Sequence, residues 1–203
     1  MPTGTPIRDI REQLLVIADE LLLRNGPDAL TSRAVTTEAG VAKGILYRHF
    51  PDFVTFLATL VLTHIERLDA LASNLRRSAG DGSPTDNVTR ALVVALSPSA
   101  IAAANLVTSR HELLARLRLT TPTGVPILTE TTKMIAAYLT AERGLGRIAL
   151  STDVDTLAVI LVGSAHLLAA SSQPAGFDTN ELRTVVTSAM NTAITTRRPA
   201  RQT

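Results

Sequence analysis

Apolar residues recur every three or four positions along nearly the whole chain, and the strict alternation of a half-buried strand is missing. This spacing places the apolar side chains on one face of a helix. A shorter face near the N-terminus consists of Ile10, Leu14, Ile17 and Leu21, and the longest one of Phe53, Phe56, Leu57, Leu60, Val61, His64, Leu68, Leu71 and Leu75. We therefore predict an all-α fold, in which three short N-terminal helices precede a larger helical body.

Capping residues and prolines predict where the helices begin and end. Thr31 is a suitable N-cap for a short second helix that Gly40 ends, and Asp52 for a long fourth helix. Ser109 and Glu112 have the spacing of a capping box. The predicted helices are, in order, 6–24 (capped by Thr5, with Pro6 in its first turn), 31–39, a short helix within 40–51, 52–79, 85–96, one from 97, one from 109, one that ends at 144, one capped by residues 152–155 and one capped by Asp178, before a frayed tail at 197–203.

The composition excludes several classes of protein. Cysteine is absent, which excludes disulfides, thiolate metal sites and cysteine nucleophiles. Residues 1–15 lack the basic segment and apolar run of a signal peptide. The longest uncharged apolar stretch, about 156–170, is shorter than the ~20 residues that a membrane span needs. We expect a cytoplasmic protein without a membrane segment. The formal net charge is only +2, so charge alone does not indicate nucleic acid as a partner.

The stretch GVAKGILYRHFP, residues 40–51, fits the second half of a helix-turn-helix. Val35 and Ala39 on the preceding helix face inward, and Gly40 permits the tight turn. The second helix of such a motif must leave one face free for the major groove. An ordinary helical hairpin with a polar face is the alternative. In the helix-turn-helix, Val41 and Leu46 fill the space between the helices, and the free face carries Lys43, Gly44, Tyr47 and Arg48.

These residues resemble the signature of TetR-type transcriptional repressors, whose pattern runs Gly-Val-x-x-x-x-Leu-Tyr-x-His-Phe. The preceding stretch TSRAVTTEAG, residues 31–40, matches the family too, and the strong resemblance covers about residues 10–60. The resemblance implies an N-terminal three-helix helix-turn-helix DNA-binding domain at residues 1–51. It also implies a larger helical domain at residues 52–203 that binds an effector and forms a dimer.

The resemblance implies roles for individual residues. Arg33 corresponds to a position that often contacts bases, and Lys43 and Gly44 correspond to positions that face base edges. Tyr47 and His49 correspond to phosphate-binding positions, although packing at the domain junction is an alternative for His49. The predicted DNA-binding residues are Thr31, which also caps the second helix, Arg33, Lys43, Gly44, Tyr47, Arg48 and His49.

The chain departs from the family pattern at some positions. Ala42 and Ile45 replace hydroxyl residues that are common there, and Asp52 lies where a lysine is common nearby. The first fifty residues carry six basic and six acidic side chains, but within residues 31–50 three bases face one acid. Binding to DNA would therefore depend on the local placement of charge.

The resemblance also implies a small-molecule pocket in the larger domain. His64, His111 and His166 lack a second histidine four residues on, and no HExxH motif occurs, so a structural role is favoured for each. His166 lies alone in an apolar helix and needs a hydrogen-bond partner, either a structural group or a ligand oxygen. We expect no metal and no cofactor. Candidate ligand-binding residues are Leu106, His111, Met134, Tyr138 and His166, which offer apolar area with a few polar tips.

The predicted function is a dimeric repressor that binds double-stranded DNA. The last two helices, 153–171 and 179–196, are expected to form the homodimer interface, although the small residues at 163–165 also suit packing within one chain. Two-fold symmetry demands a palindromic operator. A small apolar effector would tilt the fourth helix and release the DNA.

Two alternatives stay open. A helical enzyme or cofactor-binding bundle is one, but paired Glu-x-x-His motifs, a glycine-rich phosphate loop and a serine elbow are all missing from the sequence. A helix-turn-helix regulator that answers to a partner protein, without a small-molecule ligand, is the other.

Overall fold

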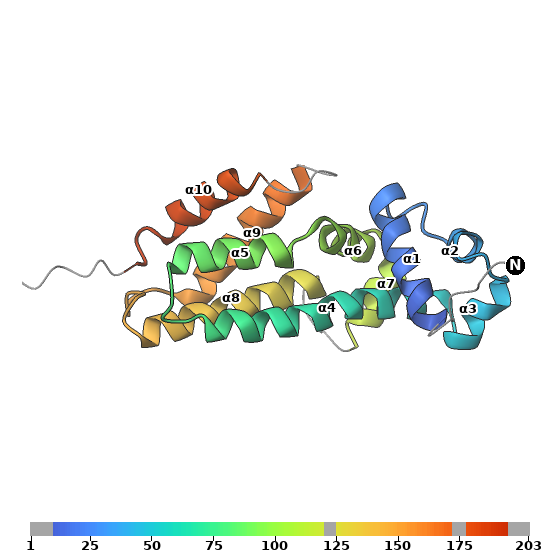
Figure 1. Ribbon diagram of the computed structural model, residues 1–203, viewed down its shortest axis with the longest axis horizontal. Helices are drawn as coiled ribbons and strands as arrows, with labels where there is room; N and C mark the ends of the chain where they lie inside the picture. Colours follow the sequence, from blue (N-terminus) through green and yellow to red (C-terminus); the bar gives the residue numbers. More distant parts are fainter. Residues whose placement is uncertain (1–9, 120–124, 172–177, 195–203) are drawn as a thin grey trace, which may run out of the picture. The chain divides into compact units, whose positions relative to one another are not determined.

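The computed structural model describes residues 10–119, 125–171 and 178–194, and within them it contains ten α-helices and no β-strand (Figure 1). The predicted all-α fold is confirmed. Thr5 and Pro6, which were expected to open the first helix, and the expected tail at 197–203 lie outside the described residues.

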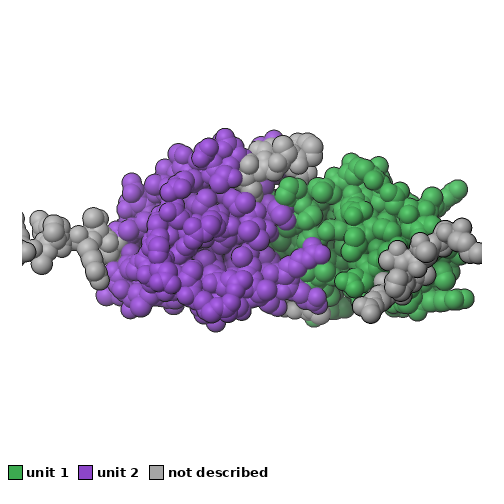
Figure 2. Space-filling model, viewed as in Figure 1, with its two compact units in different colours: residues 1–65, 98–127 green, residues 66–97, 128–203 purple. Residues whose placement is uncertain are grey.

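The chain divides into two compact units (Figure 2). Unit 1 comprises residues 1–65 and 98–127, and unit 2 comprises residues 66–97 and 128–203. All the predicted DNA-binding residues belong to unit 1. A domain boundary after residue 51 stays a prediction.

α1 (Ile10–Asn25) is the central helix of unit 1. It packs against α2 (Ser32–Glu38), α3 (Lys43–His49) and α6 (Pro98–Ser109). Unit 1 also contains α7 (His111–Leu117) and the first half of α4 (Phe53–Arg77). Because neighbours lie on two sides of α1, its buried face is wider than a single stripe. The fully buried side chains are Leu14, Leu15, Ala18, Leu21 and Leu22, whereas Ile10 and Ile17 of the predicted stripe are only partly buried.

The helix caps follow the predictions at most positions. The Thr31 hydroxyl accepts a hydrogen bond from the N–H of Ala34 at 3.1 Å. The Asp52 carboxylate accepts one from the N–H of Thr55 at 2.6 Å, at the start of α4. Asp178 likewise caps α10 (Thr179–Met190). These short side chains satisfy N–H groups that the helix itself leaves unpaired.

The predicted capping box at Ser109 is wrong. Ser109 is the last residue of α6, and its hydroxyl donates to the carbonyl of Leu106 at 3.0 Å. Because the hydroxyl is already engaged with its own helix, it does not cap the next one. α7 begins at His111 instead, and Arg110 occupies the N-cap position without a side-chain cap hydrogen bond.

His64 has a structural role in the interior of unit 1. Its side chain is buried, and its Nε2 lies 2.9 Å from Oδ1 of Asp19 on α1. The pair gives the imidazole a polar partner in an otherwise apolar interior, as a buried ring nitrogen requires. The structural interpretation favoured for this histidine matches what is observed.

Unit 2 contains the second half of α4, α5 (Pro84–Ala95), nearly all of α8 (Pro126–Gly144), α9 (Val154–Ser171) and α10. α10 packs against α5 and α9 and buries Leu182, Val186 and Met190. Beyond α10, the carbonyl of Ala193 accepts a hydrogen bond from the N–H of Ala149 at 2.7 Å. This bond ties the segment that follows α8 to the segment that follows α10.

A buried polar network joins α5 to α8. Nδ2 of Asn87 donates to the carbonyl of Asp81 and to the hydroxyl of Tyr138, both at 2.9 Å. The Tyr138 hydroxyl donates in turn to Oε1 of Glu142 at 2.5 Å. Burial, with the hydrogen bond to Glu142, raises the pKa of Tyr138, so the phenol keeps its proton as a donor. The network replaces the water that these buried groups have lost.

Arg147 supplies the counter-charge for the buried Glu142 carboxylate. Its Nε lies 3.3 Å from Oε2 of Glu142, and its Nη2 donates to the carbonyl of Gly82 at 2.5 Å. Oε2 accepts no hydrogen bond from the residues that the structure describes, so its attraction to Arg147 is an ion pair alone. The network thereby fixes the loop between α4 and α5 onto α8.

α9 is longer than the apolar stretch read from the sequence. Among the described helices it is the one that, taken singly, is long and apolar enough to cross a membrane by length and composition. Two bent pairs, α3 with α4 and α5 with α6, pass the same test only when each pair counts as one span. The inward side of α9 consists of Val154, Leu157, Ala158, Leu161, Val162, Ala165 and Ala169, all of which are buried.

We predict that Tyr138→Phe lowers the free energy of unfolding by about 1–3 kcal/mol, because it removes the hydroxyl that accepts a hydrogen bond from Asn87 and donates one to the buried Glu142 carboxylate. Chemical denaturation measures the change. The matched control is Tyr47→Phe, the other tyrosine of the chain, whose side chain is 42% exposed. We expect that control to shift stability by less than about 0.5 kcal/mol. A Tyr138→Phe variant as stable as the parent protein would contradict a stabilising network.

Candidate DNA interface

α2, the turn after it and α3 form the predicted helix-turn-helix. Val35 and Leu46 are fully buried between the helices, while Ala39 and Val41 are partly buried. Gly40 has a φ of 65°, a left-handed conformation that strains any residue with a Cβ. α2 packs against α3, and both pack against α1. These contacts fix the orientation of the short helix α3.

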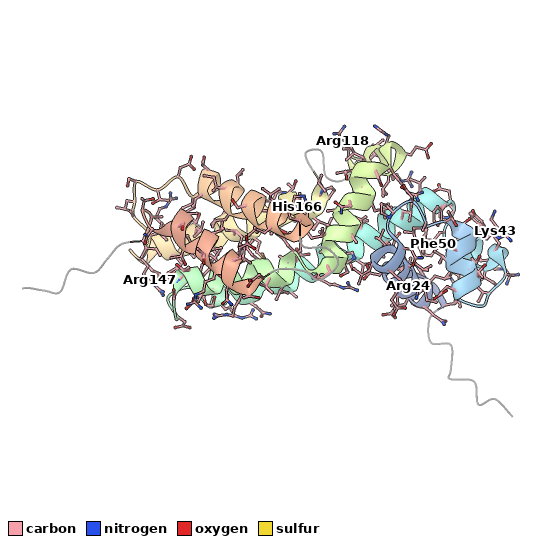
Figure 3. The ribbon with its side chains drawn as sticks, turned by 90° about the horizontal axis from the view of Figure 1, so that it is seen from above. Arg24, Lys43, Phe50, Arg118, Arg147 and His166 are labelled. Carbon is pink, nitrogen blue, oxygen red and sulfur yellow. The ribbon has the colours of Figure 1, made fainter. Side chains whose placement is uncertain are left out.

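An aromatic cluster holds the C-terminal end of α3. Phe50 is 2% exposed, and its ring meets that of Phe56 edge-on at 4.9 Å between centroids. Phe53 stacks on the same Phe56 ring at 5.6 Å. The guanidinium of Arg11, on α1, lies 5.1 Å from the centroid of Phe50, a cation–π distance. In Figure 3 Phe50 lies among the helices, whereas Lys43 points away from them.

The opposite face of α3 is exposed at every residue that was predicted to bind DNA there, namely Lys43, Gly44, Tyr47, Arg48 and His49. Nζ of Lys43 lies 5.8 Å from the centroid of the Tyr47 ring, so the cation and the phenol are presented together. Apart from its chain neighbours and the backbone of its own helix, no atom of the described residues lies within 4 Å of the place where a Cβ on Gly44 would stand, which leaves the backbone open to close approach. The exposure of His49 argues against packing as its role.

The charge on this face is positive because the acid near it is already paired. Nη2 of Arg24, on α1, lies 2.8 Å from Oε1 of Glu38, the one acid in residues 31–50. The hydrogen bond and charge of Glu38 raise the pKa of Arg24. Within the part of the chain that the structure describes, Arg33, Lys43 and Arg48 take part in no ion pair. Three cations are therefore available to a polyanion.

Thr31 and Asp52 lie at the starts of α2 and α4. The Thr31 side chain is exposed, like that of Arg33 two residues later. The hydrogen bond from the N–H of Thr55 lowers the pKa of the Asp52 carboxyl and keeps it ionised as a cap. This capping role explains why an acidic residue stands at position 52, near the place where the family pattern commonly has a lysine.

The five predicted ligand-binding residues are divided between the two units. In unit 1, Leu106 is fully buried and His111 is exposed. In unit 2, Met134 is buried and Tyr138 belongs to the polar network. His166 is half-buried, and burial lowers its pKa. Its Nδ1 is buried without a hydrogen-bond partner among the described residues, so the expected structural hydrogen bond at this nitrogen is not seen there.

His111 lines a cavity of unit 1. The cavity has a volume of about 490 Å³ and lies between the start of α4 and the α6–α7 junction. This volume is within the range of small-molecule sites. Its lining residues are Phe53, Val54, Leu57 and Leu113, which are apolar, with Arg110, His111 and Glu112.

Sequence reasoning missed the contacts of Arg110, which lies between Ser109 and Glu112 of the predicted capping box. Nη2 of Arg110 donates to the carbonyl oxygens of Pro27 and Leu30, both at 2.7 Å, in the turn between α1 and α2. Because these partners lie 83 and 80 residues away along the chain, no local pattern marks the contact. Among the described residues no group of three or more His, Asp or Glu side chains is placed to hold a metal ion.

Comparison with known proteins places the helix-turn-helix in a family. The model for "Bacterial regulatory proteins, tetR family" matches residues 14–52, from α1 to the cap of α4. The chain is 34% identical over 67 residues to the HTH-type transcriptional repressor KstR of Rhodococcus jostii. That match spans 33% of this chain and 32% of the repressor, so the chain covers about a third of this relative's length.

Solved structures share the fold over most of the chain. A TetR-family transcriptional regulator from Agrobacterium tumefaciens superimposes with a TM-score of 0.70, at 14% identity, over 91% of this chain and 97% of that one. A gamma-butyrolactone receptor, an ArpA-like protein, superimposes with a TM-score of 0.65, at 20% identity, over 94% of this chain and 91% of that one. The family model covers α1 to α3, and the similar solved structures share the fold of the helices that follow, so in both respects the chain is similar to TetR-type transcriptional regulators.

Proposed function

We propose that this protein is a dimeric repressor that binds a palindromic DNA operator and releases it when a small-molecule effector binds. The exposed face of α3 is the observation that carries this proposal, because it combines unpaired cations with an open backbone at Gly44. Backbone phosphates attract the cations, and the major groove admits a helix. The curated relative is named a repressor, which supports repression over activation.

The individual roles follow from position and chemistry. Lys43 and Gly44 begin α3, the end that enters the groove in this motif, so they suit contacts with base edges. Tyr47, Arg48 and His49 lie further along α3 with donors that suit phosphate oxygens. Thr31 and Arg33, at the start of α2, suit the DNA backbone and an adjacent base respectively.

We predict that Tyr47→Phe, which loses a phosphate contact, weakens binding to operator and to random DNA alike, whereas Lys43→Ala, which loses a base-edge contact and a charge, weakens binding to the operator more than to random DNA. Loss of the Lys43 cation should also reduce the slope of log K against log salt by up to about 0.9, whereas Tyr47→Phe removes no charge and should leave the slope nearly unchanged. Fluorescence anisotropy at several salt concentrations measures both quantities. Lys133→Ala, which removes the chain's other lysine on α8, is the matched control and should bind like the parent protein. If Lys43→Ala also binds like the parent, α3 is not the reading helix.

The dimer is supported most directly by the outer side of α9. Val159 is 60% and Leu167 67% exposed, and Ile160 and Gly163 are exposed between them at helical spacing. Contiguous large apolar side chains in water indicate an interaction surface. Of the small residues considered for the interface, Ala165 faces inward within its own subunit. The exposed side chains of α10 are polar or charged, so α9 supplies the apolar part of the interface.

We predict that Val159→Glu dissociates the dimer, because an unpaired charge buried in an interface costs several kcal/mol, or about a hundredfold or more in dimer affinity. Sedimentation velocity over a concentration series measures this. Val94→Glu on α5 is the matched control, since Val94 is 59% exposed, like Val159. The dimer proposal fails if the parent protein is monomeric at micromolar concentration. A Val159→Glu variant that dimerises like Val94→Glu would exclude α9 from the interface.

We propose that the effector binds within residues 52–203 and acts through α4. The protein is proposed to act in the cytoplasm. The gamma-butyrolactone receptor among the similar folds supports a small molecule as the signal. α4 begins four residues after α3 ends, and the ring contacts of Phe50 and Phe53 with Phe56 connect the two helices. A ligand that displaces the start of α4 therefore moves the cluster that holds α3. The alternative is a regulator that is controlled by a protein partner. A thermal-shift screen of small-molecule ligands distinguishes this alternative from a small-molecule effector.

A further inference from the structure

We propose that the cavity between the start of α4 and the α6–α7 junction binds an amphipathic carboxylate, an acid with an apolar tail. Arg110 would receive the carboxylate and, in doing so, release the turn between α1 and α2. The inference deepens the proposed function. Binding of the carboxylate at this cavity does not depend on that function, but its effect on DNA binding does.

The lining of the cavity suits an apolar tail with one acidic end. Phe53, Val54 and Leu57 on α4 and Leu113 on α7 provide its apolar walls. A volume of about 490 Å³ is enough for a small ligand. The polar lining groups all come from one short run, Arg110 to Glu112, so the polar end of a ligand would lie beside this run.

Arg110 has unused capacity to bind an anion. Its Nη2 makes the two hydrogen bonds to Pro27 and Leu30, and the other guanidinium nitrogens, Nε and Nη1, have no hydrogen-bond partner among the described residues. A guanidinium binds a carboxylate through two parallel hydrogen bonds, and both of its paired donor edges, Nε with Nη2 and Nη1 with Nη2, include Nη2, so a bidentate carboxylate must displace at least one of the two carbonyls. His111 adds a ring nitrogen beside it, while Glu112 is exposed, so water screens its repulsion of an acid.

A bound carboxylate competes with the two backbone carbonyls. Both carbonyls are neutral acceptors, whereas a carboxylate carries a full negative charge and can form two parallel charge-assisted hydrogen bonds with the guanidinium. When the guanidinium turns toward the acid, its bonds to Pro27 and Leu30 lengthen. Leu30 immediately precedes Thr31, the N-cap of α2, and Pro27 lies three residues before Leu30. The helix-turn-helix therefore loses its anchor at the start of α2.

The first experiment measures binding without DNA. Octanoate is titrated by calorimetry into the parent protein, into Arg110→Gln and into Arg118→Gln, and octanamide serves as the uncharged probe of the same length. Arg118, labelled in Figure 3, is exposed, ends α7 and does not line the cavity, so its substitution is the matched loss of charge. We expect saturable octanoate binding to the parent and to Arg118→Gln, and binding at least about tenfold weaker to Arg110→Gln. Octanamide should bind the parent and Arg110→Gln equally weakly.

The proposal is overturned if octanoate does not bind the parent, or if it binds Arg110→Gln as tightly as Arg118→Gln. Because Arg110→Gln also removes two internal hydrogen bonds, its folding is checked by circular dichroism. Val54→Phe is a second variant that narrows the cavity and leaves Arg110 unchanged. It should weaken octanoate binding to a similar extent, and unchanged affinity in this variant would place the site elsewhere.

The second experiment measures the release of the turn. Hydrogen–deuterium exchange of peptides that cover residues 26–38 is compared with and without saturating octanoate, and octanamide is the control ligand. We expect octanoate alone to speed exchange there. Unchanged exchange with octanoate bound would overturn the coupling through Arg110. Operator binding is assayed separately, so a protein that binds octanoate and opens the turn, yet binds no DNA, contradicts the proposed function and not this site.

Discussion

Leu46 and Phe50 are buried on one side of α3, and this burial decides what the helix-turn-helix presents to solvent. A helix of seven residues is not stable by itself in water, so α3 takes its position from its anchors. Each buried side chain of this size contributes roughly 1.5–3 kcal/mol. With Leu46 and Phe50 fixed inward, Lys43 and Tyr47 must face outward. The aromatic cluster around Phe56 then joins the same anchor to the start of α4.

The charge of the candidate DNA interface depends on which acidic side chains are already paired more than on the net charge of the first fifty residues. The first fifty residues hold as many acids as bases, yet the face around α3 is basic. Glu38 is neutralised by Arg24, and the Asp52 carboxylate is turned to the N–H groups at the start of α4. Both acids therefore make contacts within the folded chain. A protein with almost no net charge can still offer a polyanion a local cluster of cations.

Buried and half-buried polar residues serve two different purposes in this molecule. Tyr138 has its hydroxyl engaged by both Asn87 and Glu142, so it fixes a loop and has little left to offer a ligand. Among the described residues, Arg110 makes hydrogen bonds through Nη2 alone, and it lines a cavity. A polar side chain with spare donors beside an empty volume is a better candidate for recognition than one whose bonds are complete.

Much of this protein was determined by local sequence. Helix order, the caps at Thr31, Asp52 and Asp178, the turn at Gly40 and the outward face of α3 were all predicted, because each depends on residues within a few positions of one another. The tertiary structure alone decided which helices lie beside each other. It therefore decided that α1 buries a wider face than one stripe, that Tyr138 belongs to a network and that Arg110 reaches the turn after α1. Contacts between residues tens of positions apart leave no periodic signal, since they depend on the packing of whole helices.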